Sequence, residues 1–424
     1  MNRSQAPYSR TFRLSCLPRE RPRVEALLQS EGFRFEPLDF YAAARLLTRE
    51  PKPLGSSLAA AFGLIYIQDR SSMLPPLALN PQAGDTVLDL CASPGGKTGI
   101  LSECVGPEGL VLANEPNHKR LLTLRRNLLV KNAMNVVTCH YQGEGLPAAD
   151  RAFSRILADV PCSAWGTAAK NPKVTRLWRE ETIAPLIRLQ RRLLVHSSGL
   201  LAPGGRLLYS TCTTNPQENE EQVHWARSEL GLEVFELPVF SNFVLESGAS
   251  RTRDGCLRIH GEASQGQSFF LAGLTKPGRE NEPDTLLEPK PHPEWELLGS
   301  LFPHPVCADG VPSGRIAVRK NQLEFKPAAA ERVLSRSLVW QGMYLGKQRE
   351  TAHISSRARR LLPPAGRGPE LVVHTAGELR QLLQGQSLQV EPALGQRRLG
   401  LYFQDLPLGW LTCKGRRCFW TDRT

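Results

Sequence analysis

Short apolar runs alternate with longer amphipathic segments between residues 84 and 211, and this rhythm predicts a sheet covered by helices. We expect strands at residues 87–90, 109–115, 135–139, 155–159 and 206–210. We expect helices between them at residues 97–104, 117–130 and 181–201. Strands that alternate with helices indicate an α/β fold with a doubly wound, mainly parallel, Rossmann-like sheet. In such sheets ligands bind outside the carboxyl ends of the strands.

The chain on either side of this core has a different pattern. Ahead of it, a small α+β unit is predicted by a strand at residues 11–17, a helix at 19–31 and an extended segment at 33–38. Residues 63–69, after this unit, look like a strand or loop. Residues 276–293 are rich in proline and charge and have little apolar surface to bury, so we place a linker at residues 276–305. Beyond it we expect a β-rich unit, with strands at residues 317–326 and 371–374, a helix at 376–384 and a β-meander over 399–420.

The composition adds an expectation about the partner. The 424 residues carry 53 Lys and Arg against 41 Asp and Glu, which gives a net charge of +12 and a pI near 9.4. This excess favours a polyanion such as nucleic acid, with a merely soluble basic enzyme as the alternative. Near the C-terminus, Lys414, Arg416 and Arg417 interleave with aromatic residues. That pattern predicts RNA docking, and a scaffold or dimerisation module is the alternative.

The apolar runs and the cysteines of the sequence indicate the cellular compartment of the protein. The sequence has no run of about 18 apolar residues that could span a membrane, and its first residues lack the apolar core of a signal peptide. The ten cysteines show no C-x-x-C spacing, and the two closest, Cys413 and Cys418, have no further partners for zinc. We therefore predict no metal site, free thiols and a reducing, cytoplasmic environment.

A glycine-rich turn follows the first strand of the predicted sheet. The sequence CASPGGKT at residues 91–98 joins that strand to a helix, so a ligand there meets bare backbone and unpaired N–H groups. The turn has neither the dinucleotide fingerprint nor the phosphate-loop signature. We therefore predict a nucleoside cofactor such as S-adenosylmethionine, with a plain glycine turn as the alternative. Glu115, which ends the next strand, is a candidate for the ribose hydroxyls, or alternatively a capping or solvated acid.

Two cysteines occupy equivalent places after neighbouring strands. Cys162 follows the fourth strand, three residues beyond Asp159, and Cys212 follows the fifth strand. Adjacent strand ends would bring both thiols over one pocket, although a buried structural cysteine is the ordinary alternative. Cysteine suits chemistry at C5 of cytosine, because a thiolate that adds to C6 makes C5 nucleophilic. Asp159 is the candidate that holds the edge of the base and stabilises the charge of the adduct.

These motifs carry a family resemblance. CASPGGKT at residues 91–98, ANE at 113–115, DVPCSAWGT at 159–167 and YSTCTTNPQENE at 209–220 resemble the Sun/nucleolar-protein family of RNA (cytosine-5)-methyltransferases. The resemblance is greatest to the bacterial members that act on small-subunit (16S) ribosomal RNA, and it is specific over residues 60–225. It implies an N-terminal RNA-contacting unit at residues 1–60, an S-adenosylmethionine-dependent methyltransferase domain at 61–275 and a PUA-like RNA-binding domain at 306–424.

The resemblance also implies roles for single residues. Cys212 would be the nucleophile, Cys162 would help to resolve the covalent adduct, and Lys170 would lie near RNA phosphate or the target base. S-adenosylmethionine would be held by Glu115, Asp159 and the turn residues Cys91, Ala92, Ser93, Pro94, Gly95, Gly96 and Lys97. The implied partner is ribosomal RNA or the small ribosomal subunit, and we expect a monomer.

One position departs from the family pattern. Many members have an Asp-Gly pair near the adenine of the cofactor, and this chain has Gln142-Gly143. Gln142 can still accept a hydrogen bond from adenine N6 through its carbonyl, but it lacks charge, which predicts weaker cofactor binding.

Two other functions stay open on the sequence. A DNA cytosine-5 methyltransferase uses the cysteine of its Pro-Cys motif as nucleophile and needs no thiol after the later strand, so Cys212 argues against it. An RNA-binding assembly factor with a vestigial methyltransferase fold is the non-enzymatic alternative. Cys162, Cys212 and Asp159 argue against that reading, and Gln142 keeps it open.

Overall fold

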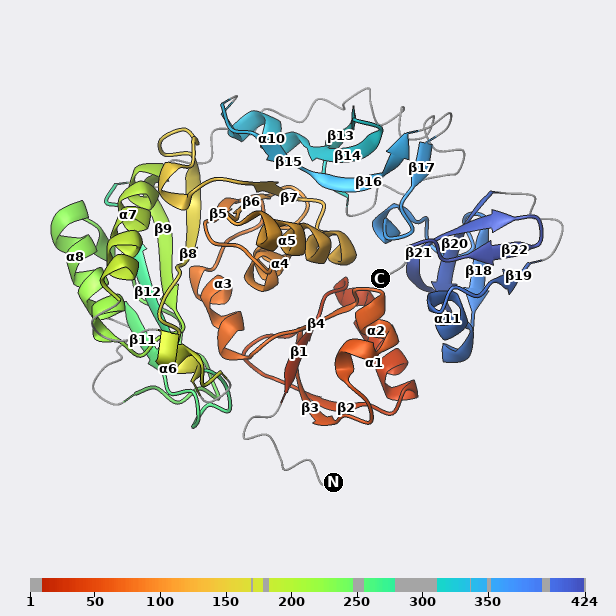
Figure 1. The fold of residues 1–424 in the computed structure, drawn as a ribbon, viewed down its shortest axis with the longest axis horizontal. Coiled ribbons are helices and arrows are strands. Elements are labelled where there is room, and N and C mark those ends of the chain that lie inside the picture. The colour runs from red at the N-terminus through yellow and green to blue at the C-terminus, as the bar shows by residue number, and fades with distance from the viewer. Residues whose placement is uncertain are drawn as a thin grey trace.

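The computed structural model describes residues 10–168, 171–177, 183–246, 255–278, 311–335, 337–348, 352–390 and 397–422. Its largest sheet has the strand order β10-β12-β9-β8-β5-β6-β7-β15, with β11 paired to β12 (Figure 1). The parallel strands at its centre are β5 (Thr86–Asp89), β6 (Leu110–Asn114), β7 (Val136–Cys139), β8 (Phe153–Asp159) and β9 (Leu201–Thr211). The doubly wound parallel sheet is therefore confirmed. The chain crosses from one half to the other next to β5, which is where such sheets bind their ligands.

Antiparallel strands extend the sheet at both edges. At one edge β12 (Phe269–Thr275) pairs with β9, and both β10 (Glu233–Val234) and β11 (Cys256–Ile259) pair with β12. At the other edge β15 (Trp340–Gln341) pairs with β7, so part of the C-terminal region completes this sheet. Pro203, Gly204 and Gly205, which precede the strand expected at residues 206–210, lie inside β9, where the pairing with β8 is irregular. Gly204 there has a φ of 74°, a conformation that glycine adopts without strain.

Helices cover both faces of the sheet because successive strand residues point to opposite sides. Val87 of β5 packs on one side with α3 (Leu74–Leu79), α4 (Gly96–Val105) and α5 (His118–Lys131). Leu88 packs on the other side with α7 (Ala184–Leu200), α8 (Glu220–Leu230) and α10 (Ala328–Val333). The short helix α6 (Val174–Leu177) lies in the segment before α7. The central strands are buried along almost their whole length, as their apolar sequences predict.

The N-terminal unit is a four-stranded sheet with the order β2-β3-β1-β4 and two helices. Its elements are β1 (Thr11–Leu14), α1 (Arg21–Ser30), β2 (Arg34–Pro37), β3 (Ala44–Arg49), α2 (Leu58–Ala61) and β4 (Ile65–Ile67). The predicted α+β unit is confirmed, but β4 pairs with β1 and extends the unit past the expected boundary at residue 60.

The region expected as one C-terminal unit contains two small sheets. The first has the order β13-β14-β16-β17 and comprises β13 (Gly314–Arg319), β14 (Gln322–Pro327), β16 (Met343–Gln348) and β17 (Ala352–Ile354). The single strand predicted at residues 317–326 is wrong, because Lys320 and Asn321 both have positive φ and turn the chain into a hairpin. The predicted linker at residues 276–305 lies almost wholly outside the described residues.

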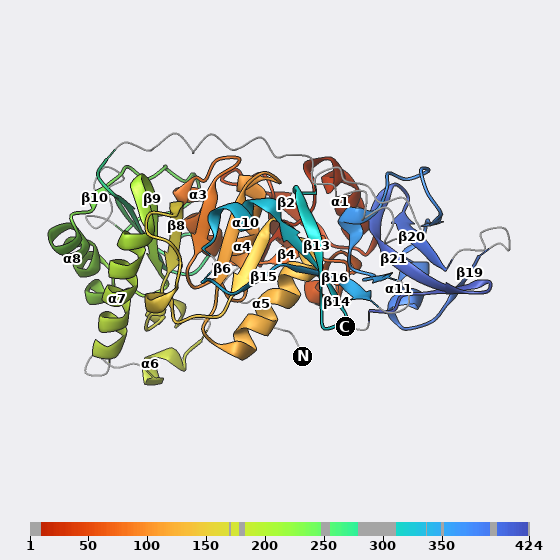
Figure 2. The same ribbon diagram turned by 90° about the horizontal axis from the view of Figure 1, so that it is seen from above.

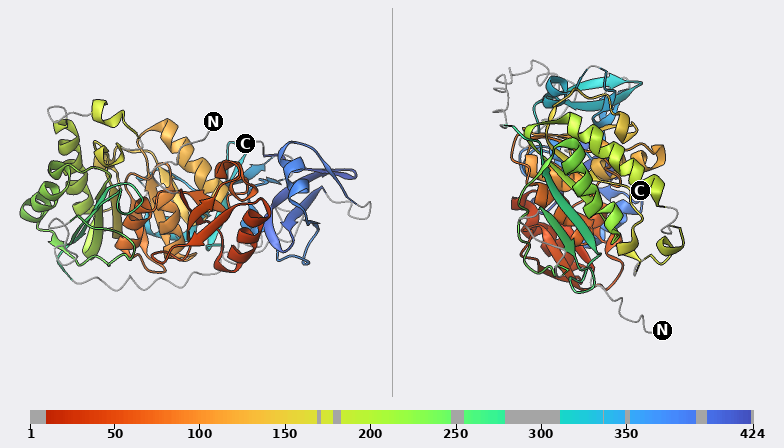
Figure 3. Two further views of the ribbon diagram at one scale, coloured as in Figure 1. Left: turned by 90° about the horizontal axis from the view of Figure 1, so that it is seen from below. Right: turned by 90° about the vertical axis from the view of Figure 1, so that its left-hand side faces the viewer.

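The second C-terminal sheet confirms the predicted β-meander. It has the order β18-β20-β21-β22-β19, with β18 (Glu370–Val373), β19 (Leu388–Gln389), β20 (Arg398–Phe403), β21 (Leu406–Lys414) and β22 (Arg417–Phe419). Helix α11 (Ala376–Leu383) begins at Thr375 with a capping box that Glu378 completes. Seen from above and from below, this sheet lies at the end of the long axis opposite α8 (Figures 2 and 3).

Two expectations about this sheet are corrected. Trp410 and Trp420 are buried, and Trp420 packs edge-on against Phe62 of the N-terminal unit with 5.2 Å between ring centroids, so these aromatic rings form core. Cys413 and Cys418, expected as free thiols, form a disulfide across the directly opposed positions of β21 and β22. No helix among the described residues is long and apolar enough to cross a membrane.

Candidate active site

The glycine turn between β5 and α4 forms one wall of a cavity of about 180 Å³. Gly95 begins the turn of the helix with a φ of 98°, and a Cβ on Gly96 would come within 2.9 Å of the Tyr66 ring. Glycine is therefore required where the backbone meets the cavity. The lining residues are Tyr66, Ile67, Gln68, Ser72, Asp89, Cys91, Ala92, Ser93, Pro94, Gly96, Lys97 and Asp159.

The N-terminal unit supplies a wall of this cavity that sequence reasoning missed. Gln68 accepts a hydrogen bond from Arg13 Nε at 3.3 Å and donates to the Ser72 carbonyl at 3.0 Å. Arg13 also donates to the Gly96 carbonyl at 3.3 Å. Lys131 donates to the Gly95 carbonyl at 3.0 Å, and its ammonium lies 3.4 Å from the centroid of the Tyr66 ring. Buried cations thus fasten the turn to β1 and β4.

Asp89, which ends β5, contributes a carboxylate to the cavity. Thr98 donates a hydrogen bond to one of its oxygens at 2.7 Å, while the other oxygen has no partner among the described residues. Burial raises the pKa of Asp89 to about 7. An unpaired buried acceptor in a cavity suits an ammonium donor, and S-adenosylmethionine carries one. The bare glycine backbone and this acceptor therefore fit the expected cofactor.

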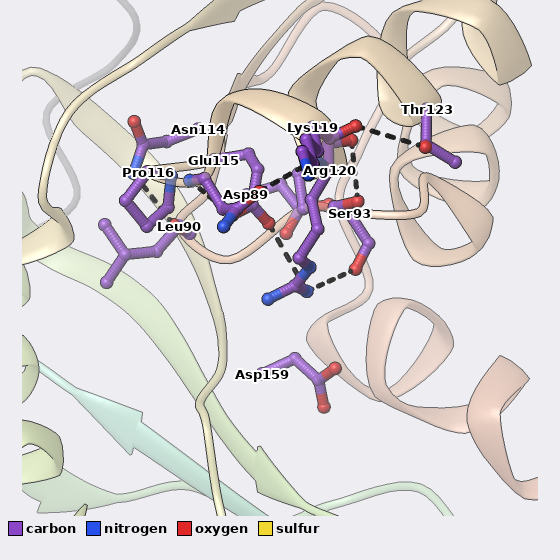
Figure 4. A network of polar contacts seen from close by, with 12 residues as sticks. Asp89, Leu90, Ser93, Asn114, Glu115, Pro116, Lys119, Arg120, Thr123 and Asp159 are labelled. Carbon is purple, nitrogen blue, oxygen red and sulfur yellow. Dashed lines mark hydrogen bonds and ion pairs between the residues drawn. The ribbon is translucent and has the colours of Figure 1, made fainter.

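Neither Glu115 nor Gln142 lines the cavity. Glu115 is 1% exposed; one of its oxygens accepts from Asn117 N at 2.8 Å, and the other lies 3.3 Å from Arg120 Nη2. Figure 4 shows the Arg120 side chain between Glu115 and Ser93, whose carbonyl it also contacts at 3.0 Å. Gln142 is exposed and directly precedes Gly143.

Asp159 and Lys97 form an ion pair inside the cavity. Lys97 Nζ lies 2.8 Å from one oxygen of Asp159, and Ser210 donates to the other oxygen at 2.8 Å. Burial alone would lower the pKa of Lys97, but the Asp159 carboxylate outweighs it and raises the pKa. Lys97 was expected only as part of the turn; its pairing with a residue 62 positions later is visible only in the fold.

The two predicted cysteines come together. Cys162 follows β8, Cys212 follows β9, and their sulfurs are 3.5 Å apart. Contact with the Cys162 sulfur lowers the pKa of Cys212 and raises that of Cys162, and the Lys97 ammonium also favours the Cys212 thiolate. Of the two sulfurs, Cys212 is therefore the one that a nearby cation favours as a thiolate.

A buried carboxylate that sequence reasoning did not single out holds both cysteine loops. Glu218 is fully buried and accepts hydrogen bonds from Ser163 N at 2.9 Å, Ser163 Oγ at 2.5 Å and Gln190 Nε2 at 3.0 Å. Ser163 Oγ is also 2.7 Å from the Thr213 hydroxyl. Ser163 and Thr213 directly follow the two cysteines in sequence, so Glu218 fixes the separation of the two sulfurs.

Replacing Glu218 with alanine should destabilise the protein, because at least two buried donors would lose their acceptor at about 1–3 kcal/mol each. Urea denaturation should show the loss, and Glu218→Gln should recover part of it, since its amide oxygen still accepts. Glu221→Gln, on the exposed face of α8, is the matched control and should leave stability unchanged. Equal stability of Glu218→Ala and the unaltered protein would show that this network does not hold the loops.

The predicted RNA-contacting residues lie apart from this cavity. Lys414, Arg416 and Arg417 are exposed around the β21–β22 turn, in the sheet at the far end of the long axis (Figure 2). Lys170 lies outside the described residues.

The sheet, the glycine turn and the cavity at the strand switch define an S-adenosylmethionine-dependent methyltransferase. Residues 76–275 match the family described as 16S rRNA methyltransferase RsmB/F. The chain is 30% identical over 342 residues to ribosomal RNA small subunit methyltransferase F of Pectobacterium carotovorum, which covers 79% of this chain and 69% of the relative. It belongs to this RsmB/F family.

Two further comparisons agree. The protein of the same name from Serratia proteamaculans is 34% identical over 64% of this chain and 58% of its own length, so this chain spans roughly three fifths of that relative. The crystal structure of a methyltransferase homologue from Pyrococcus horikoshii superposes with a TM-score of 0.55 at 32% identity, covering 64% of this chain and 87% of the other.

Proposed function

We propose that this protein transfers a methyl group to C5 of a cytosine in RNA, with small-subunit ribosomal RNA as the substrate, through a covalent bond between Cys212 and C6 of the base. The observation that carries the proposal is the pair of thiols 3.5 Å apart beside the cofactor cavity. A single sulfur would suffice to attack. Two sulfurs in hydrogen-bond contact suit a reaction in which a bond to sulfur is made and later broken.

The first step belongs to Cys212. Its lowered pKa makes the thiolate available, and attack forms the S–C6 bond while the C5=C6 electron pair moves to C5. Asp159 forms an ion pair with Lys97 and can accept a hydrogen bond from the amino group of the base. That contact fixes the base while the charge of the adduct develops.

The later step belongs to Cys162. After methylation, C5 loses its proton to a base, the C5=C6 bond forms again and the Cys212 thiolate leaves. The Cys162 thiol, whose raised pKa keeps it protonated, donates to that same sulfur and stabilises it as it departs. The asymmetry of the two thiols thus supports attack by Cys212 and release assisted by Cys162.

S-adenosylmethionine supplies the electrophilic methyl group when it is bound. Residues of this chain that would hold it are the turn backbone at 91–97, Asp89 with its unpaired oxygen, and Asp159. Glu115 would bind the ribose once Arg120 gives up its contact with the carboxylate. Gln142, exposed after β7, is proposed for the adenine.

Glu115→Ala should weaken S-adenosylmethionine binding by about 1–3 kcal/mol, because the ribose hydroxyls would lose a charged acceptor. Titration calorimetry on the purified variant measures this directly. Glu144→Ala, in the turn after β7, removes a partly exposed carboxylate whose contact is with Arg192 and serves as the control. Unchanged affinity in Glu115→Ala would remove this residue from the cofactor site.

RNA is favoured over DNA because the matched family and relatives are named as methyltransferases of ribosomal RNA, and because the DNA-type reaction needs no thiol after β9, where this chain has Cys212. The intact ion pair and thiol pair likewise favour an enzyme over an assembly factor. We propose that residues 311–422, which form the two small sheets and β15, contribute RNA contacts, with the exposed cations at the β21–β22 turn among them.

A further inference from the structure

A second cavity, of about 560 Å³, opens where the N-terminal unit meets the C-terminal sheet. One side is built from residues 17–23 at the start of α1, and the other from residues 359–365 and the turn between β20 and β21. The two parts share one hydrophobic core, so the walls of the cavity are held in a fixed arrangement. Four arginines line it, with two acids: Arg19, Arg23, Arg359, Arg360, Glu20 and Asp405.

Two of the four arginines are already neutralised. Arg359 is buried, and its Nη1 lies 3.1 Å from Glu20. Arg23 pairs with Asp405 at 2.6 Å, with both side chains largely exposed. Among the described residues, no hydrogen bond or ion pair holds the guanidinium of Arg19 or Arg360, and the Glu20 carboxylate that pairs with Arg359 also raises the pKa of Arg360. The cavity therefore holds an excess of two positive charges.

The backbone at Arg360 is held by hydrogen bonds with neighbouring segments. Its backbone N–H donates to Asn132 Oδ1 at 3.3 Å, at the end of α5. The segment just before it is fixed by Trp410, whose backbone N–H and indole N–H donate to the carbonyls of Ser356 and Ala358 at 3.0 and 2.9 Å. Burial and the neighbouring Arg359 lower the pKa of Arg360 to about 10, so it remains charged at neutral pH but is under-solvated. An under-solvated guanidinium on a backbone held in this way favours an anion.

We propose that this cavity binds a phosphate of the RNA backbone, with Arg19 and Arg360 as its ligands. The inference rests on the proposed function, because it takes RNA as the substrate. Guanidinium groups bind phosphate oxygens in a forked, charge-assisted geometry, and the remaining wall is apolar and rich in proline, so the site is formed in advance. The N-terminal unit lines both this cavity and, through Tyr66 and Gln68, the cofactor cavity. An RNA strand bound here is therefore oriented relative to the active site.

The test compares Arg19→Ala/Arg360→Ala with the unaltered protein in binding to protein-free small-subunit ribosomal RNA at several salt concentrations. We expect RNA binding at least 10-fold weaker, and a log–log salt slope reduced by about 0.7–0.9 because one phosphate contact is lost. Arg332→Ala, which removes an exposed charge from α10, is the control for a non-specific effect of net charge. Cofactor affinity should stay unchanged in both variants, which verifies that the fold is intact.

The outcomes separate this inference from the proposed function. If the unaltered protein methylates RNA and the double variant binds RNA with the same affinity and slope, the phosphate site is wrong and the function stands. If the double variant binds naked RNA normally but loses affinity only for assembled small subunits, the cavity contacts a protein and the inference is overturned. If the unaltered protein neither binds nor methylates RNA, the proposed function itself fails.

Discussion

Cys212→Ala should abolish methyl transfer while leaving RNA and cofactor binding within about twofold, because only the attacking sulfur is removed. The loss should be complete within detection, since the base is not nucleophilic at C5 until the S–C6 bond exists. No complex with RNA should survive denaturation. The measurement is a denaturing gel of protein incubated with RNA and S-adenosylmethionine, combined with counting of transferred methyl groups.

Cys162→Ala should give the opposite result on the same gel, which is a protein–RNA complex that survives denaturation. The attacking thiolate remains, but the thiol that contacts it at 3.5 Å is gone, so release is impaired. We expect at most one turnover per enzyme and a band shifted by covalently bound RNA. Cys104→Ala, on α4 and outside the cavity, removes a thiol without touching the pair and should behave as the unaltered protein. A trapped band in Cys212→Ala and none in Cys162→Ala would reverse the two assignments.

Asp159→Asn should lower kcat by about 10²–10³-fold, the usual cost of losing one charged group that stabilises a reacting centre. The substitution keeps the shape and leaves an oxygen for the Ser210 hydroxyl, but it leaves Lys97 buried without its counter-charge. The rate should fall at saturating RNA and cofactor, so single-turnover methylation is the appropriate measurement.

The control for this substitution is Asp85→Asn. Asp85 lies just before β5, at the amino end of the sheet, and its carboxylate is 3.6 Å from Arg155. Asp85→Asn removes an ion pair of a similar kind far from the cavity, so its kcat should stay within about twofold of that of the unaltered protein. Equal rate losses in the two variants would mean that Asp159 acts only through stability.

The central sheet could be predicted because its strands are short apolar runs that are buried on both faces, and their order along the chain fixes which ends share an edge. That is why Asp159, Cys162 and Cys212 were brought to one place by the sequence pattern alone. The hairpin at residues 314–327 was missed because Lys320-Asn321 is not a strong turn signal and interrupts an alternating pattern only briefly.

Other features depend on contacts between distant segments and have no local signal. Tyr66 and Gln68 reach the cofactor cavity only because β4 pairs with β1 and Arg13 anchors both to the turn. Glu218 is an ordinary acid in the sequence, and its role becomes visible when Ser163 and Thr213 converge on it. Trp410 and Trp420 interleave with basic residues in the sequence, but Trp420 is buried by packing on the N-terminal unit, and Trp410 by packing on the β13-β14-β16-β17 sheet.

The most direct test of the proposed function is to identify the methylated nucleoside. Small-subunit ribosomal RNA and assembled small subunits from a strain that lacks the gene, with total DNA as comparison, would be incubated with the purified protein and methyl-labelled S-adenosylmethionine, then digested to nucleosides. We predict that the label appears in 5-methylcytidine from RNA, at one or a few positions by bisulfite mapping. Label in another nucleoside, label in DNA alone, or no transfer to any of these substrates would contradict it.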